Sequence, residues 1–191
     1  RTLVKDPASK MQLLIDCGLF QGPKPRRLLN WNPVVDPKTL DAILLTHAHT
    51  DHSGLLPRLV KMGYAKPIYC SEATADLCRI LLMDSAHLQE EDAEYANHSR
   101  YSKHSPALAL YDKVDAAKTL DLLRPVKSDV WHELHPHLQF RFLRAGHILG
   151  SSLVQLLFQG PHGPRTITFS GDLGNGRSLI IKQNTCYNCR N

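Results

Sequence analysis

The amino-acid sequence predicts an α/β domain built of stacked layers with mixed β-sheets. Three observations support this prediction. Strand-like segments dominate both ends of the chain, helical segments occupy its middle, and some strands are the continuous apolar runs typical of a sheet covered on both faces. Of the 191 residues, 42% are hydrophobic and 21% are charged, a composition that fits one ordinary globular domain rather than a disordered, fibrous or membrane protein.

The first half of the chain alternates predicted strands with predicted helices. Residues 11–18, MQLLIDCG, are expected to form a strand, with little sequence ahead of them to supply a partner. Residues 39–47, TLDAILLTH, form an apolar run that predicts a buried strand. Residues 53–62 place apolar side chains at helical spacing before a glycine, so we expect a helix there. Residues 67–71, PIYCS, predict the next strand, and Ser71 begins a second helix.

The second half is predicted to hold one more helix and three consecutive strands. Residues 87–110 are mostly polar without a sustained period, so we expect them to run over the surface, except that QEEDAEY at residues 89–95 could extend the preceding helix. Residues 114–126 show helical spacing and stop at a proline. Alternating patterns and apolar runs between glycine or proline clusters then predict the strands LQFRFLRAGH, SSLVQLLFQ and RTITFSGD.

Charge and apolar content limit the partners and the compartment. The 23 basic and 18 acidic residues give a formal net charge of +5, which favours a polyanionic partner without identifying one. No apolar run approaches the roughly 20 residues of a membrane-spanning helix, and the first residues do not resemble a signal peptide. We therefore expect a cytoplasmic protein that does not bind membranes. The 5 cysteines are irregularly spaced, which argues for reduced thiols.

A dense cluster of metal-competent side chains follows the second predicted strand. The segment THAHTDHSG holds His47, His49, Asp51 and His52 within six positions. On an extended segment His47 and His49 point the same way and can present two imidazole nitrogens to one ion. Asp51 and His52 lie past the turn, offset toward a second ion. These ligands fit zinc or manganese, and iron would also fit. The alternative, unrelated histidines on a polar loop, explains four such residues poorly.

Two further strand ends carry isolated ligand types between glycines. RAGHILGSS places His147 after one predicted strand, and TITFSGDLG places Asp172 after another. Taken singly, either residue is explained as well by a turn or a helix cap. Loops at strand ends often build active sites on a rigid scaffold, so together with the histidine cluster they predict one shared site.

These motifs resemble a known superfamily. HAHTDH matches the HxHxDH signature of the metallo-β-lactamase superfamily, and His147 and Asp172 follow in the order that superfamily uses. The segments LLIDCGLFQG, DSAHLQEEDAEYAN, GHILGSSLVQL and FSGDLG are similar to its RNA-processing branch, which carries an inserted β-CASP domain and includes ribonuclease J and the polyadenylation-site endonuclease. The resemblance spans residues 11–175 and implies a four-layer αββα fold with two mixed sheets.

The resemblance also implies a role for each site residue. His47, His49 and His147 would bind a first metal, Asp51 and His52 a second, and Asp172 would bridge both. Two zinc ions are expected, with Asp51 and Asp172 as catalytic carboxylates and a metal-bound hydroxide that cleaves RNA phosphodiester bonds. Asp16 would orient a metal ligand through a hydrogen bond. A carboxylate that only closes a strand-end turn would occupy the same position.

The resemblance leaves parts of the family pattern unmatched. We expect residues 1–175 to be a partial metallo-β-lactamase-like domain, incomplete at both ends, with no β-CASP domain. Residues 176–191 form an atypical tail that does not match the family's continuation, and its Cys186 and Cys189 are interpreted as incidental thiols. A seventh metal ligand is not visible, so the second metal site is expected to be incomplete.

Two other functions remain open. A small-molecule hydrolase of the same superfamily, such as a thioesterase, would use nearly the same ligands. A truncated, inactive metal-binding subunit is the second alternative. Whichever function holds, a homodimer or a partner in a processing complex is a further expectation. RNA is the expected partner of the first interpretation. Three tyrosines and three basic residues could supply a surface for it, although an ordinary amphipathic surface explains them at least as well: Tyr95, Tyr101, Tyr111, Arg100, Lys103 and Lys113. WHELHPH at residues 131–137 is expected to be a solvated loop.

Overall fold

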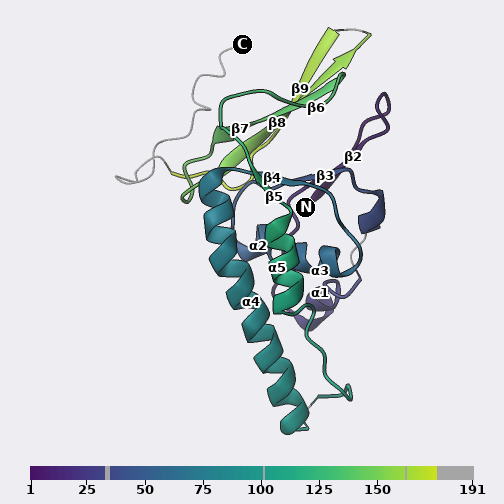
Figure 1. Ribbon diagram of the computed structural model, residues 1–191, viewed down its shortest axis with the longest axis vertical. Coiled ribbons are helices and arrows are strands. Elements are labelled where there is room, and N and C mark those ends of the chain that lie inside the picture. Colours follow the sequence, from purple (N-terminus) through teal and green to yellow (C-terminus); the bar gives the residue numbers. More distant parts are fainter. Residues whose placement is uncertain (33–34, 101, 162, 176–191) are drawn as a thin grey trace.

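The computed structural model describes residues 1–32, 35–100, 102–161 and 163–175. Within these residues two β-sheets lie against each other, and the helices lie on one side of the pair (Figure 1). The first sheet has five described strands in chain order: β1 (Thr2–Lys5), β2 (Gln12–Ile15), β3 (Ala42–Leu44), β4 (Ile68–Cys70) and β5 (Leu123–Pro125). The second has four: β6 (His132–His135), β7 (Leu138–Arg144), β8 (Ser152–Gly160) and β9 (Gly163–Phe169).

The helices cover one face of the first sheet. They are α1 (Lys24–Leu28), the 3₁₀ turn η1 (Pro37–Thr39), α2 (Thr50–Ser53), α3 (Leu56–Lys61), α4 (Glu72–His98) and α5 (Lys113–Asp121). The longest, α4, starts beside the sheets and extends well beyond the other helices (Figure 1). None of the helices in the described ranges is long and apolar enough to cross a membrane.

The two sheets differ in strand direction. β1 pairs antiparallel with β2, whereas β2, β3, β4 and β5 pair in parallel, so the first sheet is mixed as predicted. The described strands of the second sheet all pair antiparallel. The prediction of two mixed sheets is therefore wrong for the second one. Its strands follow one another through short connections, which can join antiparallel neighbours but are too short for a parallel crossover.

Burial on both faces of β3 explains its continuous apolar sequence. Ala42 and Leu44 pack between the sheets, whereas Ile43 packs into the core beneath the helices. In the second sheet, Phe140 and Phe142 of β7 alternate with half-buried neighbours and fill the space between the sheets. The described residues thus form three layers in the order helices, mixed sheet and antiparallel sheet, and within them no helix covers the outer face of the second sheet.

Some predicted elements have different bounds, for identifiable reasons. β1 pairs with β2, although little sequence was expected to precede the first strand. The helix predicted over residues 114–126 ends at Asp121, and β5 follows after one residue as a strand at the edge of the sheet, beside β4, with Leu123 buried. The solvated loop predicted at residues 131–137 is half strand, since β6 pairs with β7 before the turn at Pro136. The predicted tail at 176–191 lies outside the described residues.

The largest difference is that α4 continues to His98, through half of the predicted surface segment at residues 87–110. Its second half packs through small side chains, and Ala86 contacts Tyr111 and Ala116 in a minor core of its own. Alanines give almost no apolar period in the sequence, so the helix was not predicted beyond residue 95. Tyr111 is fully buried and bonds to Ser85 (2.8 Å between hydroxyl oxygens), so it cannot serve as the RNA-stacking residue considered above.

Gly18 allows β2 and the start of α2 to meet without any intervening side chain. A Cβ atom at Gly18 would lie 1.5 Å from the carbonyl oxygen of Asp51. The flanking amides of Cys17 and Leu19 donate to the carbonyl oxygens of His52 (2.7 Å) and Thr50 (2.9 Å). The backbone around Gly18 therefore sets the position of the helical turn that carries Asp51 and His52.

We predict that Gly18→Ala displaces this turn and lowers the free energy of unfolding by about 1–3 kcal/mol or more, the usual cost of overpacking. Urea unfolding followed by circular dichroism measures the change. Gly160→Ala is the matched control, because a Cβ there would meet only the Gly163 carbonyl oxygen, at 3.7 Å. Equal stability of the two variants would contradict the prediction.

Candidate metal centre

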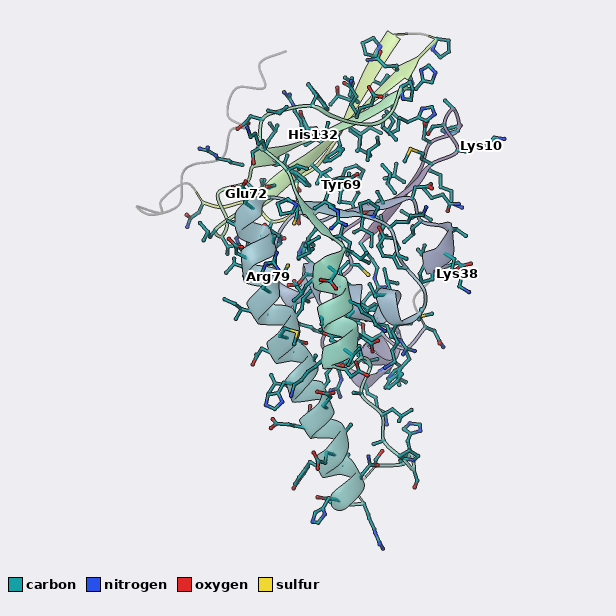
Figure 2. All side chains as sticks on the ribbon, in the orientation of Figure 1. Lys10, Lys38, Tyr69, Glu72, Arg79 and His132 are labelled. Atoms are coloured by element: carbon teal, nitrogen blue, oxygen red, sulfur yellow. The ribbon has the colours of Figure 1, made fainter. Side chains whose placement is uncertain are left out.

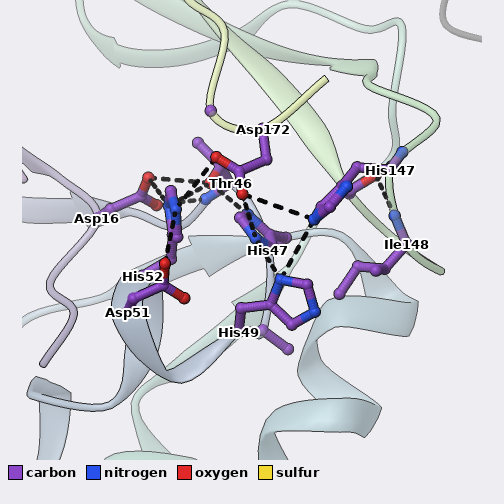
Figure 3. Close-up of polar contacts among 12 residues, drawn as sticks. Asp16, Thr46, His47, His49, Asp51, His52, His147, Ile148 and Asp172 are labelled. Atoms are coloured by element: carbon purple, nitrogen blue, oxygen red, sulfur yellow. Dashed lines mark hydrogen bonds and ion pairs between the residues drawn. The ribbon is translucent and has the colours of Figure 1, made fainter. Parts of the chain in front are cut away.

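The histidine segment lies where β3 gives way to α2. After β3 the chain runs extended through Thr46 and His47, and α2 then begins at Thr50 with His49 as its N-cap residue. This change from extended to helical backbone directs His47 and His49 to one place. Asp51 and His52, on the first turn of α2, lie beside it (Figure 3). The local fold therefore produces the two offset groups that the sequence predicts.

Four ligand atoms of the first group converge. The Nε2 atom of His47 lies 3.1 Å from Nδ1 of His49, which lies 3.3 Å from Nε2 of His147. The Oδ2 atom of Asp172 lies 3.6 Å from that His147 atom and 3.9 Å from the His47 atom. All four atoms fit within 4.8 Å of one another, and among the described residues this is the sole cluster that meets that criterion for three or more ligands.

The second group shares Asp172 with the first. Its other oxygen, Oδ1, lies 3.4 Å from Nε2 of His52, and Oδ2 of Asp51 lies 3.9 Å from the same nitrogen. The two oxygens of one carboxylate thus face different groups of ligands. The structure brings together all six predicted ligands, although the second group holds fewer donors than the first.

Burial is graded across the cluster. The side chain of His47 is 1% exposed and forms the floor, whereas the side chains of Asp172 and Asp51 are 44% and 53% exposed. Water and substrate can therefore reach the carboxylates, while the imidazole beneath them is shielded.

Thr46 and Asp16 contact the imidazoles of His47 and His52 on the side of each ring that faces away from the cluster. The Asp16 carboxylate accepts hydrogen bonds from the Thr46 amide (2.7 Å) and hydroxyl (2.9 Å), and its Oδ2 lies 2.8 Å from Nδ1 of His52. The Thr46 oxygen lies 3.0 Å from Nδ1 of His47. Because the hydroxyl proton goes to Asp16, the Thr46 oxygen accepts from His47. Both Nδ1 atoms therefore carry hydrogen, and both Nε2 lone pairs face the cluster.

The pKa values of these two histidines shift in opposite directions. Burial lowers the pKa of His47 to about 4, with a smaller contribution from the neighbouring His52. The hydrogen bond to Asp16 raises the pKa of His52 above its ordinary value, against the effect of burial. His47 is therefore a neutral imidazole at physiological pH, which is the form that binds metal.

The donor set fits a bound divalent metal. Three imidazole nitrogens and one carboxylate oxygen around a common space are the ligands typical of zinc, and they also suit manganese or iron. The hydrogen bonds from Nδ1 fix the tautomer that such ligation requires.

The loops that carry His147 and Asp172 contact each other through their backbones. Gly174 donates its amide hydrogen to the carbonyl oxygen of Ala145 (3.0 Å), and a Cβ at Gly174 would lie 1.7 Å from the Gly146 carbonyl oxygen. The amide of Ser152 donates to the Thr46 carbonyl oxygen (2.9 Å), which joins the His147 loop to the histidine segment. Three segments distant in sequence are thus fixed around one site.

Sequence reasoning missed Thr46. Its position next to the first histidine of the motif is a signal that could have indicated it, but nothing in a single sequence shows that its hydroxyl lies between Asp16 and His47. Cys186 and Cys189, interpreted from the sequence as incidental thiols, lie outside the described residues, as does Tyr101.

The layered fold and the cluster of histidines and carboxylates at its strand ends define a metallohydrolase-type α/β domain. The model of the Metallo-beta-lactamase superfamily matches residues 9–180, so the chain belongs to that superfamily. The superfamily assignment implied by HAHTDH is confirmed.

Curated relatives of the chain indicate a narrower group of proteins than the superfamily as a whole. The chain is 37% identical over 175 residues to ribonuclease TTHA0252 of Thermus thermophilus, a match that covers 91% of this chain and 35% of that protein. It is 33% identical over 172 residues to the transcription termination factor FttA of Methanosarcina mazei, which covers 89% of this chain and 24% of that factor. The chain therefore spans roughly a quarter to a third of the length of these relatives.

A solved structure shares the fold. A metallo-β-lactamase of Cronobacter sakazakii with a HARLDQ motif superposes with a TM-score of 0.55 at 17% identity, and the match covers 94% of this chain and 58% of that one. At this identity the likeness supports the fold alone.

We predict that Thr46→Val lowers zinc affinity about 10- to 100-fold, the usual effect of removing a hydrogen-bond partner of a metal ligand. The valine keeps the shape of the side chain but leaves Nδ1 of His47 without an acceptor. Competition with a chromophoric chelator measures the affinity. Thr46→Ser retains the hydroxyl and should bind zinc nearly as the wild type does, and a valine variant that matched it would contradict the assigned role.

Proposed function

We propose that this chain is the metal-binding part of a nuclease that hydrolyses RNA phosphodiester bonds, of the RNA-processing branch that carries a β-CASP domain. The main support is the placement of Asp172, whose two carboxylate oxygens face two separate groups of ligands. A relative named as a ribonuclease, matched over 91% of this chain, supports RNA as the substrate.

In this proposal His47, His49 and His147 would hold one ion, Asp51 and His52 would hold a second, and Asp172 would be a ligand shared by the two groups. Zinc is the expected metal at both positions, and manganese and iron are the alternatives. When bound, such ions supply an activated water and positive charge that offsets the charge developing on a phosphoryl group.

The chain's own residues prepare the site for that chemistry. Asp16 and Thr46 keep hydrogen on Nδ1 of His52 and His47, so that Nε2 of each ring stays available as a ligand. Asp51 and Asp172 are the catalytic carboxylates of the proposal, because they are the ligands most exposed toward solvent and are placed to contact the incoming water and phosphodiester. Burial of His47 excludes water from the floor of the site.

We predict that the zinc-loaded chain cleaves labelled single-stranded RNA and that the double variant His47→Ala/His49→Ala loses both the cleavage and the zinc of the first group. Each substitution removes one of the three converging imidazoles, so the remaining donors hold the ion weakly. Gel electrophoresis of the RNA and elemental analysis of the protein measure the two effects.

The control removes the same number of histidines elsewhere. His87→Ala/His98→Ala changes two exposed residues of α4 and should leave zinc content and RNA cleavage unchanged. Turnover of a thioester without cleavage of RNA would replace the nuclease by a small-molecule hydrolase. Zinc binding with neither reaction would contradict a nuclease activity of this chain and favour a metal-binding subunit.

A further inference from the structure

A cavity of about 600 Å³ is lined in part by the loop that carries His147. Three segments form its walls: the first turn of α4, the residues that follow β5, and the loop between β7 and β8 that carries His147. Glu72 lines the cavity and is labelled in Figure 2 at the end of α4 nearest the sheets. The volume lies within the range of small-ligand sites and suits one nucleotide rather than a duplex.

The cavity and the metal cluster share the His147 loop. Gly146 and Ile148 line the cavity, and the histidine between them reaches the cluster, with Ile148 beside it in Figure 3. The Ser151 hydroxyl oxygen accepts from the amides of His147 (2.9 Å) and Ile148 (3.1 Å). One set of bonds therefore fixes both the metal ligand and the cavity wall.

A second set of bonds fixes the loop to the opposite wall. The hydroxyls of Ser71 and Thr74, at the start of α4, donate to the Gly150 carbonyl oxygen at 2.7 Å and 3.0 Å. The cavity thus has walls held in place by side-chain hydrogen bonds, as a preformed binding site requires.

The lining offers a partner for each part of a ribonucleotide. Lys127 and Arg144, from two different segments, are the basic groups that attract a phosphate. Glu72 and Asp129 are carboxylates, which accept hydrogen bonds from ribose hydroxyls. Ile148 and the 62% exposed Leu149 form an apolar surface on which a base can lie. Both charge signs and an apolar wall fit a nucleotide better than they fit a simple anion.

We propose that this cavity binds one ribonucleotide of the RNA strand, next to the phosphodiester that the metal cluster cleaves. The inference rests on the proposed nuclease function and adds a position and a chemistry for substrate binding. It assigns Lys127 to the nucleotide phosphate, the carboxylates to the ribose and Leu149 to the base.

Adenosine monophosphate is a suitable probe, because it carries all three parts but has no phosphodiester to be cleaved. Isothermal titration of the zinc-loaded chain should show tighter binding of adenosine monophosphate than of inorganic phosphate. Inorganic phosphate is the reference because it reports only direct contact with the metal. Lys127→Glu should weaken adenosine monophosphate about tenfold or more, the effect of one lost charge-assisted hydrogen bond. Leu149→Asp should also weaken it, and deoxyadenosine monophosphate should bind less tightly than the ribonucleotide.

Lys118→Glu on α5 is the matched control, because it makes the same change of charge at an exposed position outside the cavity lining. Lys127→Glu should lower kcat/KM for RNA, and Lys118→Glu should not. Adenosine monophosphate binding no tighter than phosphate, or equal behaviour of the two lysine variants, would overturn the cavity assignment even if the wild type cleaves RNA. Equal binding of the ribo- and deoxyribonucleotide would overturn the ribose contact. Binding through Lys127 without RNA cleavage would instead overturn the nuclease function and leave a nucleotide site.

Discussion

The rest of the site depends on the hydrogen bonds of the Asp16 carboxylate. It joins β2 to the segment after β3 and to α2, because it accepts from the Thr46 amide and hydroxyl and bonds to His52. Asp16 adopts a left-handed backbone conformation (φ 58°), which is unfavourable for a residue with a side chain. The hydrogen bonds offset that strain, so the same carboxylate that shapes the turn also sets the direction of two imidazoles.

The mixed sheet and its helices supply the rigid base for this arrangement. β3 is buried on both faces, so the histidine segment leaves a strand that cannot shift without disturbing both the helix-side core and the core between the sheets. Tyr69 of β4 reaches the second sheet, where its ring lies 5.0 Å from that of Phe140. The second sheet thereby holds the His147 loop next to the histidine segment. Two cores and one carboxylate together place ligands from three parts of the chain.

The sequence predicted the parts of the molecule whose signals are local. The apolar run of β3, the alternation in β7 and the compact HAHTDH motif each depend on neighbouring residues, and the structure agrees with them. It did not predict the length of α4, because Ala86 and Ala96 carry the packing without an apolar stripe. Strand direction in the second sheet follows from the length of its connections rather than from residue pattern. The role of Thr46 depends on a hydrogen bond to Asp16, 30 positions away, that no local pattern contains.

The backbone contact between Gly174 and the His147 loop has a consequence for metal choice. The amide of Gly174 donates a hydrogen bond to the carbonyl oxygen of Ala145. The backbone at His147 and the backbone at Asp172 therefore keep a nearly constant separation, whatever the radius of the ion. Size differences between ions must then be absorbed by rotation of side chains, and the more exposed carboxylates have room to rotate whereas the buried His47 does not. For an ion bound here, the carboxylates would therefore be the ligands that adjust to its radius, while the buried imidazole of His47 stays in place.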